Sequence, residues 1–104
     1  KNDILSERKL LSRDGIMVVI LTQDKNTGQM LGSLEVVSSG FINTEEHGDL
    51  IAEGKQVVLD SLTAQAEQGL ELNYIKTKAK EIMGGFLHRR TGRRPMIIPL
   101  VLEV

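Results

Sequence analysis

The chain has 104 residues, a length typical of one domain, and its 40% apolar and 26% charged composition excludes a disordered tail. It has no cysteine, which excludes disulfides and thiolate metal sites and predicts a reducing, cytoplasmic location. Its longest strongly apolar run, Ile16 to Leu21, is too short to span a bilayer, so we expect no membrane partner. Only three residues are aromatic, which predicts an aliphatic core.

The first elements are predicted to be a lead-in helix and two strands. Residues 1–13 carry Ile4, Leu5, Leu10 and Leu11 among charged residues, which favours a short helical linker that packs against something. Residues 16–22 are rich in β-branched residues and lack Gly and Pro, as in a buried strand. A turn at residues 24–28 leads to a second strand from Met30 to Val37. Strands joined by so short a turn should pair antiparallel.

Two helices and a last strand follow. Asn43 or Thr44 is a candidate N-cap, with Glu46 three residues after Asn43 as in a capping box. The first helix then buries one apolar face, and Gly69 ends it. The second helix has the most regular periodicity, and its apolar positions are Leu72, Ile75, Ala79, Ile82 and Phe86. Gly84 and Gly85 either weaken its last turn or end it early. A third strand runs from Met96 to Val104.

The order ββααβ predicts an α+β fold, a three-stranded sheet with two helices packed on one face. The first strand should be central, and Pro99 should place the third strand at an edge. The interior positions of both strands are apolar on both faces, whereas two helices cover only one face. The other face is therefore predicted to pack against another subunit or a neighbouring domain, unless the lead-in helix folds back over it. We assign to this interface Met17, Val19, Leu21, Ile97 and Val101.

Three segments resemble the C-terminal domain of ribonuclease J. The first is residues 8–16, where basic residues and two leucines precede Asp14-Gly15. The second is Ser38-Ser39-Gly40-Phe41. The third runs from Thr91 to Pro99 and begins Thr-Gly-Arg-Arg-Pro. The family usually has arginine at the position of Ser39, so any contact of that arginine with RNA or an acidic partner is lost here. The resemblance divides the chain into residues 1–13, a linker from upstream catalytic domains, and residues 14–104, the C-terminal domain.

The resemblance implies a parent enzyme built from a metallo-β-lactamase domain and a β-CASP domain. Such enzymes hydrolyse RNA with zinc, from the 5′ end and internally, in RNA maturation and decay. This chain would be an accessory domain that supports homo-oligomerisation and organises the catalytic domains. It would need no cofactor of its own, and none of the parent's chemistry maps onto its residues.

No residues of this chain form a recognisable catalytic or metal site. Zinc hydrolysis needs clustered His and Asp ligands, but His47 and His88 lie far apart and have no ligand partners at suitable spacing. We therefore expect the fragment alone to be neither a zinc protein nor an enzyme, although the resemblance implies a parent that is both.

Acidic and basic residues are separated along the chain. Residues 35–71 contain eight acids and one base, Lys55, whereas residues 76–94 contain seven bases and one acid, Glu81. The basic stretch has a purely structural interpretation, in which its charges interact favourably with the helix dipole and with the acidic segment. The alternative is contact with RNA phosphates. The candidate RNA-binding residues are Lys76, Lys80, Arg89, Arg90, Arg93 and Arg94. An independent RNA-binding domain of the KH type is less favoured, because residues 65–72 have only Gly69 for its Gly-x-x-Gly loop.

Overall fold

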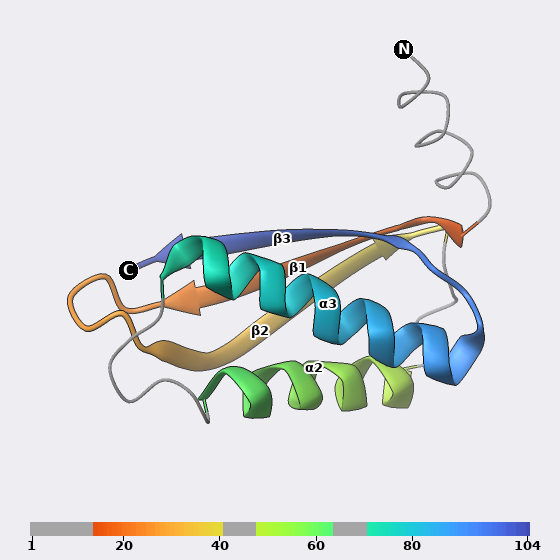
Figure 1. The fold of residues 1–104 in the computed structure, drawn as a ribbon, viewed down its shortest axis with the longest axis horizontal. Helices are drawn as coiled ribbons and strands as arrows, with labels where there is room; N and C mark the ends of the chain where they lie inside the picture. Colours follow the sequence, from red (N-terminus) through yellow and green to blue (C-terminus); the bar gives the residue numbers. More distant parts are fainter. Residues whose placement is uncertain (1–13, 41–47, 64–70) are drawn as a thin grey trace, which may run out of the picture.

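The computed structural model describes residues 14–40, 48–63 and 71–104 (Figure 1). The elements are β1 (Ile16–Gln23), β2 (Met30–Ser39), α2 (Gly48–Thr63), α3 (Leu72–Thr91) and β3 (Met96–Glu103). Strands and helices occupy separate layers, so the α+β class is confirmed, and the described elements follow the order β-β-α-α-β. The predicted lead-in helix, N-cap and helix stop at Gly69 lie outside the described residues.

The sheet has the order β2-β1-β3, which confirms β1 as the central strand and β3 as an edge. β1 and β2 are antiparallel, and their turn is closed by the Asp24 carboxylate, which accepts the Asn26 N–H at 2.7 Å. β3 runs parallel to β1, from Ile16 opposite Met96 to Gln23 opposite Glu103. A parallel return needs a crossover, and α2 and α3 provide it.

Pro99 occupies a position where its missing N–H does not interrupt the sheet. The N–H groups of Met96 and Val104 bond to Gly15 and Gln23, so even-numbered residues of this strand face β1. Peptide groups alternate in direction along a strand, and Pro99 therefore faces the open edge. The free edge of β3 lacks one donor at its centre, which disfavours pairing with a further strand.

The two helices lie side by side over one face of the sheet, α3 nearer β3 and α2 nearer β2 (Figure 1). The core between the layers is mainly aliphatic, as predicted, and its fully enclosed side chains include Met17, Leu21, Val58, Ile75 and Leu87. Gly54 lets the helices approach closely, since a Cβ there would lie 3.0 Å from Met83 Sδ and 3.2 Å from the Phe86 ring. The helix pair and the sheet therefore share one core.

α3 continues through Gly84 and Gly85 to Thr91, so the glycines do not end it early. Gly92 ends the helix in the left-handed conformation, with φ of 75°, and donates its N–H to the His88 carbonyl. The Thr91 hydroxyl donates to the Leu87 carbonyl and accepts the Arg93 N–H. This ordered C-terminus directs the chain into β3.

Candidate functional site

The predicted interface residues lie on the wrong face of the sheet. Met17, Val19 and Leu21 are 0% exposed and Ile97 is 5% exposed, because α2 and α3 cover that face. Val101 is half-buried and packs against the same core. Strand alternation separates two sets of side chains correctly, but β1 and β3 are apolar in both sets, so alternation alone does not indicate which set the helices cover.

The face that the described helices leave uncovered holds the other set. We call it the open sheet face and define it as Ile16, Val18, Ile20, Val37, Ile98, Leu100 and Leu102. Val37, Leu100 and Leu102 are 59%, 44% and 52% exposed. The register places Val18 between Val37 and Ile98, and Ile20 beside Leu100, so these side chains form one continuous apolar surface.

β2 contained the signal that could have identified this face. Leu34 and Val36 pair with Leu21 and Val19 on the helix side, whereas Glu35 pairs with Ile20 on the open side. A carboxylate is rarely placed in a sealed core. Because residues paired across a sheet lie on the same face, a solvent-facing Glu35 would have assigned Ile20 and the other even-numbered residues of β1 to the open face.

Two of the candidate RNA-binding arginines have partners within the domain. Arg90 Nη1 lies 2.8 Å from Glu53 Oε2 on α2, and its guanidinium lies over the Phe86 ring. Arg93 Nε lies 3.8 Å from Asp14 Oδ1. These partners support the structural reading for Arg90 and Arg93, although both pairs are partly exposed and each contributes less than about 1 kcal/mol.

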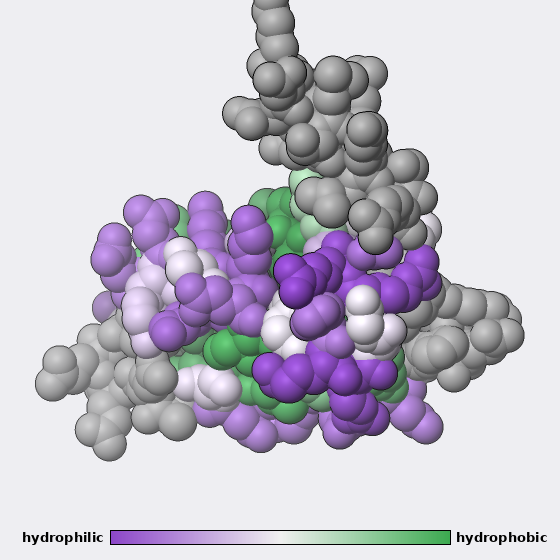
Figure 2. Space-filling view, turned by 45° about the vertical axis from the view of Figure 1, so that its right-hand side comes forward, coloured by the Kyte–Doolittle hydropathy of each residue, from purple (hydrophilic) through white to green (hydrophobic). Residues whose placement is uncertain are grey.

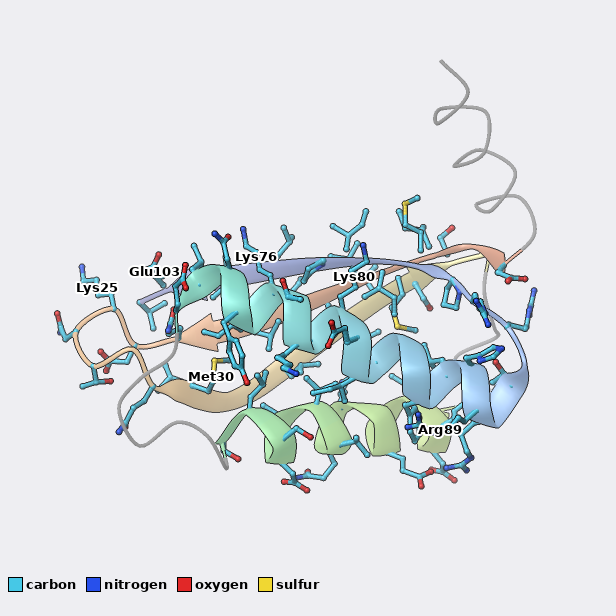
Figure 3. All side chains as sticks on the ribbon, in the orientation of Figure 1. Lys25, Met30, Lys76, Lys80, Arg89 and Glu103 are labelled. Carbon is cyan, nitrogen blue, oxygen red and sulfur yellow. The ribbon has the colours of Figure 1, made fainter. Side chains whose placement is uncertain are left out.

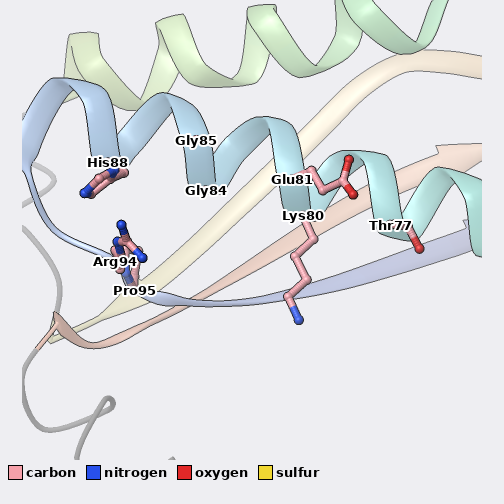
Figure 4. Close-up of a pocket in the computed structure, with 8 residues that line it drawn as sticks. All are labelled: Thr77, Lys80, Glu81, Gly84, Gly85, His88, Arg94 and Pro95. Carbon is pink, nitrogen blue, oxygen red and sulfur yellow. The ribbon is translucent and has the colours of Figure 1, made fainter.

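The remaining candidates divide between two sides of α3. Lys76 and Lys80 lie on the side toward β3, whereas Arg89 lies toward α2 (Figure 3). Lys80 and Arg94, with His88, line a groove of about 610 Å³ along the helix (Figure 4). In Figure 2, which brings the C-terminal end of α3 forward, strongly hydrophilic residues surround a paler surface there. The structure therefore brings Lys80 and Arg94 together with His88, which sequence reasoning left out.

The segments that carry the family resemblance meet at one corner of the domain. The Asp14 carboxylate accepts the Arg94 N–H at 2.8 Å, and the Gly15 carbonyl accepts the Met96 N–H at 2.9 Å. Ser39 pairs with Ile16, so its position lies at the same end of the sheet. The motifs at residues 14–15, 38–40 and 91–96 thus secure the ends of three strands.

Among the described residues, no three His, Asp, Glu or Cys side chains are grouped to hold a metal ion. His88 is exposed, and His47 lies outside the described residues. None of the described helices is long and apolar enough to cross a membrane. The part of the chain that the structure describes therefore offers two surfaces for function, the open sheet face and the groove.

Comparison with known proteins agrees with the sequence resemblance. The family model described as the ribonuclease J C-terminal domain matches residues 3–104. Ribonuclease J2 of Bacillus subtilis is 34% identical over 99% of this chain, and ribonuclease J 1 of Streptococcus pyogenes is 33% identical over 95% of it. The chain spans only 19% and 18% of the length of these relatives. The chain belongs to the ribonuclease J C-terminal domain family.

Proposed function

We propose that this chain is the non-catalytic C-terminal domain of a ribonuclease J-like enzyme and that it joins two enzyme subunits through the open sheet face. The observation that carries the proposal is the continuous apolar surface across β2, β1 and β3. Exposed apolar surfaces of this kind usually mark an interface, because water contact with several aliphatic side chains is unfavourable.

A second copy of the same chain is the occupant that fits this surface. The open sheet face presents aliphatic side chains, and Glu35 lies at β2, toward one side of the sheet. In a two-fold contact each copy presents the same surface, so apolar centres meet while the carboxylates can stay at the rim. The proposed partner is thus another subunit rather than a strongly charged protein.

The catalytic activity belongs, in this proposal, to parts of the enzyme outside this chain. Metallo-β-lactamase and β-CASP domains would hold zinc and hydrolyse RNA in the cytoplasm, and residues 1–13 would connect them to the domain. The relatives are named ribonucleases, which supports RNA as the substrate of the parent.

Sedimentation velocity of the 104-residue chain tests the proposed self-association. We expect the unmodified chain to sediment as a dimer and a variant with Val37→Glu and Leu100→Glu to sediment as a folded monomer. Both residues are exposed on edge strands, so the substitutions spare the core.

The matched control carries Ala52→Glu and Asn73→Glu, which add the same charge at exposed helix positions. This control should remain a dimer. A monomeric unmodified chain at high concentration would contradict self-association and favour a neighbouring domain as the partner. A dimer that survives both strand substitutions would contradict the open sheet face as the interface.

A further inference from the structure

The groove beside α3 has cations on its walls and an apolar floor. It follows the helix from Thr77 to His88, and Arg94 and Pro95 form its opposite wall. It continues over Met96 and Ile97 at the edge strand β3. Lys80 and His88 are eight residues apart, so they stand about 12 Å apart along the helix axis. The groove is thus long enough to contact an extended ligand at more than one point.

The groove has an excess of positive charge. Lys80, His88 and Arg94 are exposed, and no carboxylate among the described residues forms a salt bridge with them. Glu81 also lines the groove, but its side chain points in another direction from that of Lys80 (Figure 4), and its carboxylate lies 3.7 Å from Lys78 Nζ. The two cations of the groove, Lys80 and Arg94, are available to an anionic ligand, and His88 adds a ring N–H donor.

Gly84 keeps the floor of the groove open, although packing inside the domain does not require a glycine at this position. A Cβ at Gly84 would meet only Ile97 Cδ1, at 3.9 Å, which is an ordinary contact. Gly54, in contrast, has Met83 and Phe86 within 3.2 Å of its hypothetical Cβ and is required by helix packing. Glycine inside a helix costs about 1 kcal/mol relative to alanine. At Gly84 nothing in the described domain offsets that cost, and an external ligand gains room to approach the helix backbone.

From these observations we infer that the groove binds the phosphate backbone of single-stranded RNA, with Lys80, His88 and Arg94 as the contacts. The choice of RNA rests on the proposed function, which places the domain in an RNA-cleaving enzyme. Phosphate recognition needs clustered cations and an accessible surface, both of which the groove provides. The lining of the groove has no Phe, Tyr or Trp, which leaves the His88 imidazole as its one ring for base stacking, so we expect it to bind RNA with little preference for sequence.

An added protein strand is a poorer occupant of the same region. Pro99 removes a central donor from the open edge of β3, so a strand docked there would lose one backbone hydrogen bond.

The C-terminal carbonyls of α3 do not strongly oppose the binding of an anion. His88 lies in the last turn of α3, where the positive charges of Arg89 and Arg90 offset the partial negative charge of the carbonyls.

Fluorescence anisotropy with labelled, unstructured RNA of two different sequences tests the inference over a range of salt concentrations. We expect similar affinity for both sequences. Reversing two groove charges with Lys80→Glu and Arg94→Glu should weaken binding at least tenfold. It should also reduce the salt slope by about 1.4, since each single-strand phosphate contact contributes about 0.7.

Two further variants distinguish RNA binding in the groove from nonspecific attraction of RNA to the charge of the domain. Lys25→Glu with Lys55→Glu makes the same change in net charge away from the groove and should leave most of the affinity intact. Gly84→Leu fills the floor without changing charge and should weaken binding several-fold while the salt slope stays unchanged. Chemical shifts of the Gly84 and Gly85 amides should move when RNA is added to the unmodified chain.

Three results would overturn the inference: unchanged binding by the charge-reversed groove, equal loss in the Lys25 and Lys55 variant, or tighter binding of polyglutamate than of RNA. The last result would assign the groove to an acidic protein segment. Sedimentation of the groove variants should match that of the unmodified chain. Failure of RNA binding is therefore distinguishable from failure of self-association, which depends on Val37 and Leu100.

Discussion

Asp14 connects the start of β1 to the loop that leads from α3 into β3. Its side chain is 18% exposed, accepts the Arg94 N–H and lies near the Arg93 guanidinium. It thereby orients the loop residue that carries one wall of the groove. The two arginines differ in role for this reason, since Arg93 turns toward Asp14 whereas Arg94 lines the groove.

Replacing Asp14 should destabilise the fold modestly. Asp14→Ala removes the acceptor of the Arg94 N–H and should lower the free energy of unfolding by about 1 kcal/mol. Asp14→Asn keeps an acceptor and loses only the charge, so its effect should be smaller. Urea unfolding followed by circular dichroism measures both variants. Equal stability of Asp14→Ala and the unmodified chain would show that the hydrogen bond contributes nothing net.

The two helices use glycine for different purposes, although sequence alone presents Gly54 and Gly84 alike. Gly54 lies where α2 meets Met83 and Phe86 of α3, two side chains that are themselves buried. Gly84 lies on the groove side of α3 beside Ile97. Helix propensity favours alanine at both positions, so only the surroundings distinguish them.

Alanine should therefore have opposite effects at these two positions. Gly84→Ala should raise the free energy of unfolding by up to about 1 kcal/mol, through helix propensity. Gly54→Ala should lower it by about 1 kcal/mol, because separating the packed helices costs more than the propensity gain. Thermal and urea unfolding of the two single variants provide the comparison. A stabilised Gly54→Ala variant would mean that the Met83 and Phe86 side chains rearrange at little cost in free energy.

At the scale of the described domain, the two helices cover one sheet face and leave the other open, and the sheet has two edge strands. Pro99 protects the edge at β3, because its missing N–H faces outward. On the open sheet face β1 and β3 present mainly aliphatic side chains, with Thr22 beside Leu102 as a polar residue near one end. The domain thus combines an apolar sheet face that is suited to association with a β3 edge that disfavours pairing with another strand.

Restoring the edge donor should change association more than stability. Pro99→Val keeps every bond between β1 and β3 but supplies an outward N–H, so unpaired edges of different molecules can pair. We expect more light scattering on prolonged incubation, with unchanged secondary structure at the outset. The same substitution in the Val37 and Leu100 variant should scatter similarly, since edge pairing does not use the open sheet face. Unchanged light scattering by Pro99→Val would show that the missing N–H does not limit pairing at this edge.

Several features followed from the sequence because they depend on local preferences. Alternating and helical periodicities predicted the strands and helices, and Pro99 predicted the edge position of β3. The motifs of residues 8–16, 38–41 and 91–99 indicated the family, which the family match over residues 3–104 confirms. The RNA contacts of the basic stretch, residues 76–94, remain a prediction.

Only the tertiary structure decided which side chains of β1 lie beneath the helices and which bases share a groove. In β1 and β3 both faces are apolar, so burial energy is similar for either choice, and the path of the crossover selects between them. Lys80, His88 and Arg94 line one groove because α3 turns back at Gly92 into β3 and Asp14 holds that turn. This placement depends on contacts between residues as far apart as 14 and 94, which no local preference encodes.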